Sequence, residues 1–320
     1  MRRVVVPTSA DVTAATEVVH RHLVPTPVLV LDDLGPGVVA KLEVLAPTGS
    51  FKVRGGLNAV TVALERQAGT PLVAASAGNH GLGVAWAADR LGAKATVVVA
   101  ETASEAKVRA LGRFGADLVR FGASYDEAEE YALGLAAERG WRYVSPYNDP
   151  DVIAGQGSVG AELLAQVPDL DTIVVPVGGG GLVSGIGLAT ASAGTRIVGV
   201  EPETSASMAA ALAAGRAVPV DLGETMADGL AGNIEPGSVT VELARRRVDH
   251  MVSVSEAEIA EAVRYLALEH GLVTEPSGAV GVAALRSGRL GPDGATTAVV
   301  LTGRNISADL LVALCSGGAA

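Results

Sequence analysis

The sequence contains few cysteine, histidine and aromatic residues, and this scarcity excludes several classes of protein. A single cysteine, Cys315, and five scattered histidines exclude a disulfide framework and leave no spacing typical of a zinc site. Acidic residues outnumber basic ones by 35 to 24, and the net charge of −11 argues against nucleic acid or an anionic membrane as a partner. Aromatic residues make up only 3% of the chain, whereas apolar residues reach 49%. This composition is typical of a soluble protein with a sizeable core.

Two apolar stretches could suggest a membrane span or an export signal. Residues 172–195 carry no charge, but Pro176 and the glycines that follow it interrupt the stretch. Near the N-terminus, Met1-Arg2-Arg3 is followed by only three valines before Pro7, which is too short for the apolar part of a signal peptide. We therefore expect a cytoplasmic protein that has no membrane as a partner.

Short apolar runs alternate with helical patterns along most of the chain. The first helix can be capped by Thr8 or Ser9 and should run to about Leu23, with an extended segment from Thr26. At 320 residues the chain exceeds a typical single domain, and the alternation predicts an α/β fold with parallel sheets flanked by helices. We expect helices near 79–91, 104–114 and 124–139, and strands near 38–42, 72–75, 95–100, 118–121, 142–144, 172–177, 196–200, 250–254 and 297–301.

Lys52 is the strongest candidate for chemistry. It lies between a glycine-serine turn and the first turn of a predicted helix. A solvated lysine has a pKa of about 10.4, but one that is partly desolvated beside other cationic groups can lose its proton and act as a nucleophile or base. Phe51 and Arg54 flank Lys52 and could provide that setting. An ordinary solvated lysine at a helix start is the alternative.

Two turns have the form of anion-binding sites. Residues 76–81, Ser-Ala-Gly-Asn-His-Gly, and residues 178–181, four glycines, each follow an apolar strand and precede a helix. Backbone N–H groups at such a helix start can bind a carboxylate or a phosphate. The glycine run matches neither G-x-G-x-x-G nor a Walker loop. Thr302 adds a hydroxyl at the end of the strand 297–301, where α/β proteins place ligands.

In this order, these features resemble the fold type II pyridoxal-phosphate enzymes, in the threonine/serine dehydratase and serine racemase branch, whose fold is like that of tryptophan synthase β. The resemblance covers nearly the whole chain. It implies a large domain formed by residues 1–48 plus 148–320 and a small inserted α/β domain at 49–147. The matching motifs are TGSFKVRG at 48–55, SAGNHG at 76–81, VIAGQGS at 152–158, GGGGL at 178–182, ADGL at 227–230 and EPSGA at 275–279.

The resemblance also implies a role for each candidate residue. Lys52 would hold pyridoxal 5'-phosphate covalently and then remove the α-proton of an amino acid. The hydroxyl of Thr302 would face the pyridine nitrogen, which suits β-elimination, although a strand-end threonine bonded only to backbone remains an alternative. Glu275 could support the site, bind a metal or only cap a helix, and Tyr147 could pack near the cofactor. The implied cofactor-binding residues are Phe51, Lys52, Asn79, Gly178, Gly179, Gly180, Gly181, Leu182 and Thr302, and the implied substrate-carboxylate site is Ser76, Ala77, Gly78, Asn79 and His80.

The chain also departs from this family's patterns. Metal-dependent members have an aspartate six residues after a strand-end glutamate, but here Ser207 occupies that place after Glu201, with Ser205 between them, so we expect no metal. Arg304 replaces a more usual glycine, and residues 231–236 differ from the common dehydratase version; both differences could alter the substrate pocket. Because the chain ends soon after Asn305, we expect no C-terminal regulatory domain.

The expected function is that of a cytoplasmic, homodimeric ammonia-lyase. It would convert a β-hydroxy amino acid, L-threonine or L-serine, into a 2-oxo acid and ammonia. A serine racemase, a β-replacement synthase, a dehydratase for phenylserine or hydroxyaspartate, and a non-catalytic protein that binds a phosphate ligand remain alternatives. Ala77 argues against a racemase, because serine racemases have a serine there whose hydroxyl relays a proton.

Overall fold

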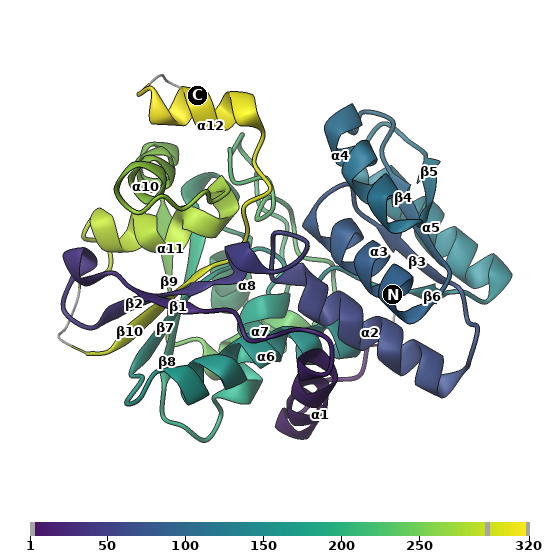
Figure 1. The fold of residues 1–320 in the computed structure, drawn as a ribbon, viewed down its shortest axis with the longest axis horizontal. Helices are drawn as coiled ribbons and strands as arrows, with labels where there is room; N and C mark the ends of the chain where they lie inside the picture. The colour runs from purple at the N-terminus through teal and green to yellow at the C-terminus, as the bar shows by residue number, and fades with distance from the viewer. Residues whose placement is uncertain (1–3, 292–294, 318–320) are drawn as a thin grey trace.

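Two separate sheets divide the chain into a large lobe and a small lobe (Figure 1). The computed structural model describes residues 4–291 and 295–317, so Met1, Arg2 and Arg3 lie outside the described residues. The large lobe contains a six-stranded sheet in the order β1-β2-β10-β7-β8-β9, and the small lobe contains a four-stranded sheet in the order β5-β4-β3-β6.

The large sheet is parallel except at one edge, where β1 runs antiparallel to β2. Every residue of β2, β7 and β10 is buried, as expected for parallel strands covered on both faces. The strands are β1 (Val28–Val30), β2 (Val38–Leu42), β7 (Thr172–Pro176), β8 (Arg196–Pro202), β9 (His250–Val254) and β10 (Thr297–Leu301).

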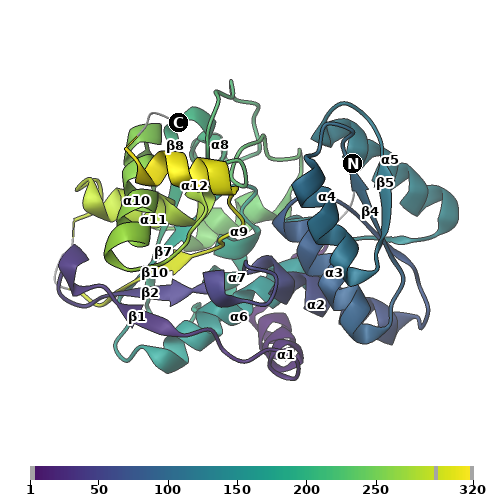
Figure 2. The same ribbon diagram turned by 45° about the horizontal axis from the view of Figure 1, so that its top comes forward.

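Helices cover both faces of the large sheet, and each face has its own apolar cluster. On one face lie α10 (Glu256–Glu269), α11 (Pro276–Arg286) and α12 (Ala308–Cys315), which Figure 2 shows side by side. On the other lie α6 (Pro150–Gln166), α7 (Gly181–Ala189), α8 (Ser207–Ala214) and α9 (Val239–Arg247). The N-terminal helix α1 (Ser9–His20) packs against α6.

The small lobe is a parallel α/β unit. Its strands are β3 (Leu72–Ala75), β4 (Ala95–Val99), β5 (Asp117–Arg120) and β6 (Arg142–Tyr143). The helices α2 (Lys52–Arg66), α3 (Asn79–Leu91) and α4 (Glu105–Leu111) pack on one face, and α5 (Tyr125–Arg139) packs on the other. Short 3₁₀ helices lie at Asp32–Leu34, Glu43–Leu45, Gly112–Phe114 and Glu203–Ser205.

The expected elements are confirmed to within a few residues. Strands 38–42, 250–254 and 297–301 and helix 79–91 have the predicted bounds. The first helix is capped by Thr8 but ends at His20, three residues early, and the predicted helix 104–114 divides into α4 and a 3₁₀ turn. The short antiparallel strand β1 was expected only as an extended segment. The small sheet falls inside 49–147, but the domain boundaries themselves stay a prediction.

Helix α2 lies between the two lobes, with α3 on one side and α6 on the other, in both ribbon views. The chain enters the small lobe at the start of α2 and returns to the large lobe through residues 144–149. None of the helices in the described ranges is long and apolar enough to cross a membrane.

Candidate active site

Lys52 is the first residue of α2 and lies at the entry to the small lobe. Its Nζ donates a hydrogen bond to the backbone carbonyl of Pro146, at 2.8 Å, in the segment that returns to the large lobe. The ring of Phe51 lies beside it, with its centroid 5.1 Å from Nζ. The lysine is therefore held where the two chain crossings meet.

Burial lowers the pKa of Lys52 to about 8, although the nearby charge of Glu275 opposes this shift. More of the amine is then neutral near physiological pH than in a solvated lysine, which favours its action as a base or nucleophile. We expected Arg54 to be a neighbouring cation that lowers the pKa of Lys52, and this expectation is wrong. The guanidinium of Arg54 is paired with Glu43 and Glu162, and burial is the cause that lowers the pKa of Lys52.

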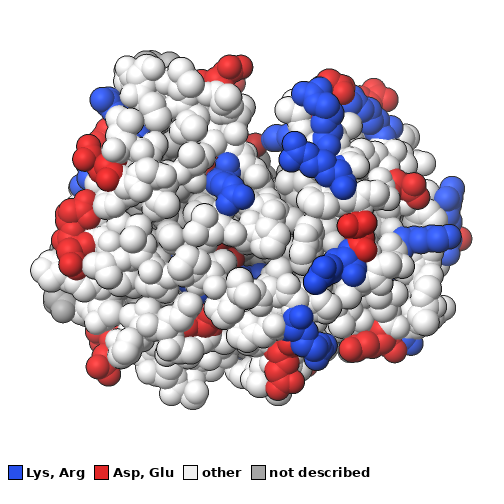
Figure 3. All heavy atoms as spheres, viewed as in Figure 1, with Lys and Arg blue, Asp and Glu red and all other residues white. Residues whose placement is uncertain are grey.

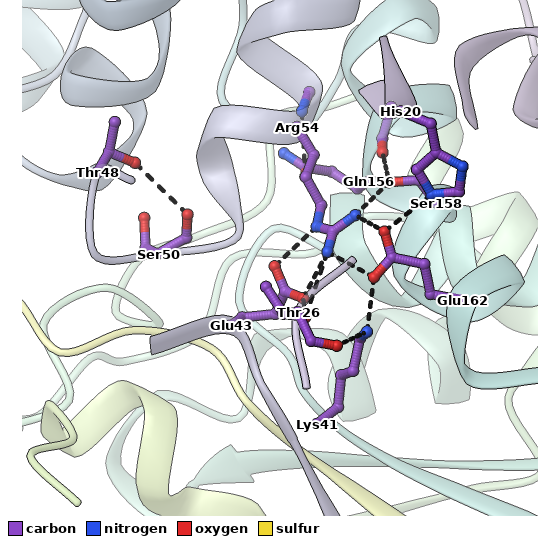
Figure 4. Close-up of polar contacts among 12 residues, drawn as sticks. His20, Thr26, Lys41, Glu43, Thr48, Ser50, Arg54, Gln156, Ser158 and Glu162 are labelled. Carbon is purple, nitrogen blue, oxygen red and sulfur yellow. Dashed lines mark hydrogen bonds and ion pairs between the residues drawn. The ribbon is translucent and has the colours of Figure 1, made fainter. Parts of the chain in front are cut away.

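This buried cluster joins α2 to α6 and to β2 (Figure 4). Arg54 forms ion pairs with Glu43 at 2.7 Å and with Glu162 at 2.6 Å, and Lys41 contacts Glu162 at 2.6 Å. All four side chains are almost completely buried. Burial opposes the charge on Glu162, but the hydrogen bonds and charges of Arg54 and Lys41 prevail and lower the pKa of this carboxyl. The partly exposed side chain of His20 contacts the same carboxylate from the protein surface.

The glycine turn, residues 178–181, leads from β7 into α7. Gly180 has a φ of +86°, a conformation that glycine adopts readily. A side chain at Gly179 would lie 2.4 Å from the ring of Tyr147, so this ring packs directly on the turn. Within the described ranges, no hydrogen bond takes up the backbone N–H groups of residues 178–180, which therefore remain available to an anion at the start of α7.

The second turn, residues 76–80, leads from β3 into α3. The Oγ of Ser76 accepts a hydrogen bond from the N–H of Gly78 at 3.1 Å, which fixes the turn. In the described chain, the backbone N–H groups of Ala77, Asn79 and His80 have no acceptor. The turn is partly exposed, apart from His80, so it can accept a second anion from the solvent side.

His80 is buried directly behind this turn. One ring nitrogen, Nε2, lies 2.9 Å from the carbonyl oxygen of Val144 and therefore carries the proton. Burial, assisted by the charge of Lys52, lowers the pKa of His80 to about 3, so the imidazole is neutral. Its side chain is thus a packed, uncharged neighbour of Lys52, and only its backbone N–H belongs to the predicted carboxylate site.

Asn79 connects the two lobes. Its Nδ2 donates to Glu275 Oε1 at 2.7 Å, and its Oδ1 accepts from Asn305 Nδ2 at 2.6 Å. Burial raises the pKa of Glu275 to about 7, despite the hydrogen bond from Asn79. The other Glu275 oxygen accepts the backbone N–H of Asn305 at 3.0 Å. Glu275 precedes α11 but makes no side-chain capping bond, so its carboxylate links the two lobes instead of capping the helix.

An ion pair between Lys107 of α4 and Asp228 of the large lobe, at 3.1 Å, also crosses between the lobes. Both side chains are largely exposed, and Figure 3 shows a groove between the lobes with basic side chains along its small-lobe side. At this groove, therefore, the lobes are linked by polar side chains that can exchange with solvent.

Thr302 follows β10 and is only 4% exposed. Its carbonyl oxygen accepts the N–H of Phe51 at 3.0 Å, which places the strand end beside the start of α2. Its hydroxyl makes no hydrogen bond to any described residue, so it is available to a ligand. Leu182 is buried in the first turn of α7 and completes the predicted set.

Glu201, Ser205 and Ser207, the residues compared above with a metal-site pattern, all form hydrogen bonds within the chain. Both carboxylate oxygens of Glu201 accept backbone N–H groups, from Met208 at 3.0 Å and from Ala209 at 3.1 Å. Ser207 donates to the carbonyl of Gly232, and Ser205 accepts from its N–H. No cluster of three or more metal-ligating side chains occurs among the described residues. Only Glu201 among these three residues carries a carboxylate, and the absence of a divalent cation here stays a prediction.

Sequence reasoning missed several residues of the site. Pro146 holds Lys52 through its carbonyl, and Asn305 links Asn79 to the large lobe. Asn148 donates from its side chain to Glu235 and accepts the N–H of Val239 at the start of α9. The partners in these bonds are distant in the sequence, so no local pattern could have indicated them.

Comparison with known proteins gives a consistent result. A model of the family described as pyridoxal-phosphate dependent enzyme matches residues 19–303. The L-threonine ammonia-lyase of Thermotoga maritima is 41% identical over 303 residues, which are 94% of this chain and 75% of that enzyme. The L-threo-3-hydroxyaspartate ammonia-lyase of Saccharomyces cerevisiae is 35% identical and covers 98% of both chains. The structure of maize serine racemase has a TM-score of 0.90 at 29% identity and covers 96% of both chains.

Proposed function

The chain belongs to the family of pyridoxal-phosphate dependent enzymes, and from this premise we propose that it is an ammonia-lyase for a β-hydroxy amino acid, L-threonine or L-serine. The reaction removes water and then ammonia and leaves a 2-oxo acid. The placement of Lys52 is the observation that carries this proposal. A lysine with a pKa of about 8 begins α2 within a cleft that presents two turns with free N–H groups.

The residues of the cleft fit pyridoxal 5'-phosphate. We assign its phosphate to the free N–H groups of residues 178–180 at the start of α7. The unbonded hydroxyl of Thr302 is suited to the pyridine nitrogen, and Phe51 and Leu182 supply apolar contact. When bound, the cofactor supplies an electron-withdrawing ring that stabilises negative charge at the α-carbon of an amino acid.

Lys52 has two tasks in this site. Its neutral amine can attach the cofactor covalently, and once free it can take the proton from the substrate α-carbon. The hydrogen bond to Pro146 and the ring of Phe51 limit the positions that Nζ can occupy. Because Glu275 lies on the opposite lobe and shares the cleft, its charge stabilises the protonated amine after the proton has been taken.

We assign the substrate carboxylate to the turn at residues 76–80. The free N–H groups of Ala77, Asn79 and His80 lie at the start of α3, where the helix dipole also favours an anion. Substrate and cofactor are then held by different lobes, since α3 belongs to the small lobe and α7 to the large one. After the β-hydroxyl has left as water, hydrolysis to ammonia and the 2-oxo acid needs only solvent.

The direct test is an assay of the purified protein with added pyridoxal phosphate. Absorbance from a cofactor–lysine linkage that borohydride fixes at Lys52, together with 2-oxo acid from L-threonine or L-serine, supports the proposal. A protein that stays colourless with the cofactor, or forms no 2-oxo acid from any β-hydroxy amino acid, contradicts it. Including 3-hydroxyaspartate and phenylserine in the panel tests the alternative lyases.

A racemase is the second candidate, because the structure of serine racemase superposes on most of the chain. Racemisation requires an acid-base group on each face of the substrate, and Lys52 serves one face only. Ala77 lies in the carboxylate turn, where its methyl group cannot transfer a proton. We therefore expect elimination with little D-serine, and added racemase activity in Ala77→Ser. Chiral chromatography that finds D-serine from the unmodified enzyme as fast as pyruvate would favour the racemase.

We also propose that the enzyme is a cytoplasmic homodimer. Large apolar side chains are exposed around the edge strand β1, with Val24 84% and Val30 58% exposed, and such side chains favour association with a second copy. Light scattering on the purified protein measures its mass in solution. A monomer at micromolar concentration would contradict this part of the proposal.

A further inference from the structure

Glycines allow α2 to approach a helix of each lobe very closely. Gly55 and Gly56 are consecutive and therefore project about 100° apart, so that Gly55 faces α6 and Gly56 faces α3. A side-chain carbon at Gly56 would lie 2.7 Å from the backbone of Gly83, and one at Gly155 would lie 2.7 Å from the backbone of Arg54. Real Cβ atoms do not approach other atoms so closely, so both helices pack against α2 backbone to backbone.

The two contacts differ in what else holds them. On the α6 side, the ion pairs of Arg54 act together with hydrogen bonds from Asn58 to the carbonyl of Asp151 and from the Gly55 N–H to Gln156. Between α2 and α3, no hydrogen bond or ion pair occurs in the described chain. That interface consists of apolar side chains and the two glycines. The direct contact between α2 and α3 is therefore steric and apolar.

Gly83 meets α2 at the catalytic lysine itself. A side-chain carbon at Gly83 would lie 2.7 Å from the carbonyl oxygen of Lys52 and 3.0 Å from the N–H nitrogen of Val53. Gly83 is also four residues, about one helical turn, after Asn79, with which α3 begins. Gly83 therefore contacts the backbone of Lys52 and lies about one helical turn after the turn to which we assign the substrate carboxylate.

We propose that Gly83 is a positioning residue that sets the spacing between Lys52 and the carboxylate-binding turn at residues 76–80. This inference rests on the proposed function, because it assigns these two parts of the cleft to base and substrate. A methyl group at Gly83 must move Lys52 and α3 apart by about 0.7 Å before ordinary contact at 3.4 Å is restored. A displacement of this size between a base and its substrate lowers turnover by roughly 10- to 100-fold.

The test compares Gly83→Ala with the unmodified holoenzyme. We expect kcat for the better of L-threonine and L-serine to fall about 10- to 100-fold, with KM changed by less than about threefold, because the turn itself remains intact. The rise in Tm on adding pyridoxal phosphate should persist, because the glycine turn that we assign to the phosphate lies in the other lobe. A kcat within threefold of the unmodified enzyme overturns the inference.

Two control variants separate spacing from stability. Gly134 lies inside α5, and a side-chain carbon there meets nothing within 4 Å, so Gly134→Ala should leave kcat and Tm unimpaired. Leu135→Ala removes a buried side chain from the apolar cluster on the opposite face of the small sheet and should lower Tm without changing kcat. A loss of kcat in Leu135→Ala equal to that in Gly83→Ala would also overturn the inference.

If Gly83→Ala does not fold, Gly56→Ala opens the same interface from α2, and the same outcomes apply. Failure of the proposed function is recognised separately, because the unmodified protein then forms no 2-oxo acid. In that case the pH midpoint for covalent attachment of the cofactor to Lys52 provides the readout. We expect it to shift by about half a pH unit or more in Gly83→Ala but not in Gly134→Ala, since the surroundings of Lys52 change only in the first. Equal midpoints contradict the inference.

Discussion

Glu162→Gln should destabilise the protein strongly, because it leaves a buried positive charge without its partner. Glu162 contacts Lys41 at 2.6 Å and Arg54 at 2.6 Å, and these three side chains are at most 2% exposed. With Glu43 the cluster has two positive and two negative charges, so the substitution leaves one excess positive charge. Removing one partner of a buried pair costs about 3–5 kcal/mol of unfolding free energy.

The pH dependence of this loss of unfolding free energy follows from the pKa of Lys41. Burial already lowers its pKa in spite of the charge of Glu162, and without that charge the pKa falls further. A folded-state pKa below the unfolded value of about 10.4 means that the folded protein binds fewer protons, so stability rises with pH in this window. At pH 9 the unfolded chain also begins to lose this proton, so the folded protein gives up less by having Lys41 neutral. The loss of unfolding free energy should therefore be smaller at pH 9 than at pH 7.

Urea unfolding of the holoenzyme at pH 7 and pH 9, followed by circular dichroism, measures the loss of unfolding free energy at each pH. The double variant Lys41→Met with Glu162→Gln restores neutrality and should recover most of the stability at pH 7. His20→Ala removes the partly exposed contact to the same carboxylate and should cost less than about 1 kcal/mol. A loss below about 1 kcal/mol for Glu162→Gln, or an equal loss at both pH values, would refute the reasoning.

Three further predictions concern the cleft and Glu201. Lys52→Ala should reduce turnover by several orders of magnitude and abolish borohydride fixation of the cofactor, while circular dichroism shows a retained fold; near-normal activity would remove Lys52 from the site. Because the pKa of Lys52 is lowered to about 8, the rate of cofactor attachment to the cofactor-free protein should rise with pH and level off above about 8; a rate that climbs until pH 10 would indicate a solvated lysine. A chelator should leave Tm and activity almost unchanged. Ser207→Asp, which adds a carboxylate near Glu201, should make Tm respond to calcium or magnesium. Calcium-dependent stability of the unmodified protein would contradict the view that the backbone N–H groups of Met208 and Ala209 satisfy the carboxylate of Glu201.

The sequence allowed the fold to be predicted where local signals agree. The strand at 38–42 and the helix at 79–91 have strong apolar patterns and clear turn residues at their ends, and both have the predicted bounds. The three-residue strand β1 follows Pro27 and is recognised only by its pairing with β2. Its edge position is a tertiary property that no local pattern carries.

The positions of the two turns were predicted better than the side-chain contacts around them. The turns at 76–81 and 178–181 start helices as expected, and both retain free N–H groups within the described chain. The direction of Arg54 could not be predicted, because its partner Glu162 is 108 residues away and only the packing of α2 on α6 brings them together. Glu275 and Asn79, which are 196 residues apart, form the same kind of long-range pair.

The two chain crossings between the lobes determine how the lobes can move. One crossing is the start of α2 and the other is the segment 144–149, and the bond from Lys52 to Pro146 ties them together. Two adjacent connections behave as a hinge, and in a rotation about a hinge the displacement of an atom grows with its distance from the axis. Opening of the groove would therefore carry Lys107 far from Asp228 while Lys52 barely changes its place. The entrance to the groove can then widen for substrate and product without displacing Lys52, the proposed base.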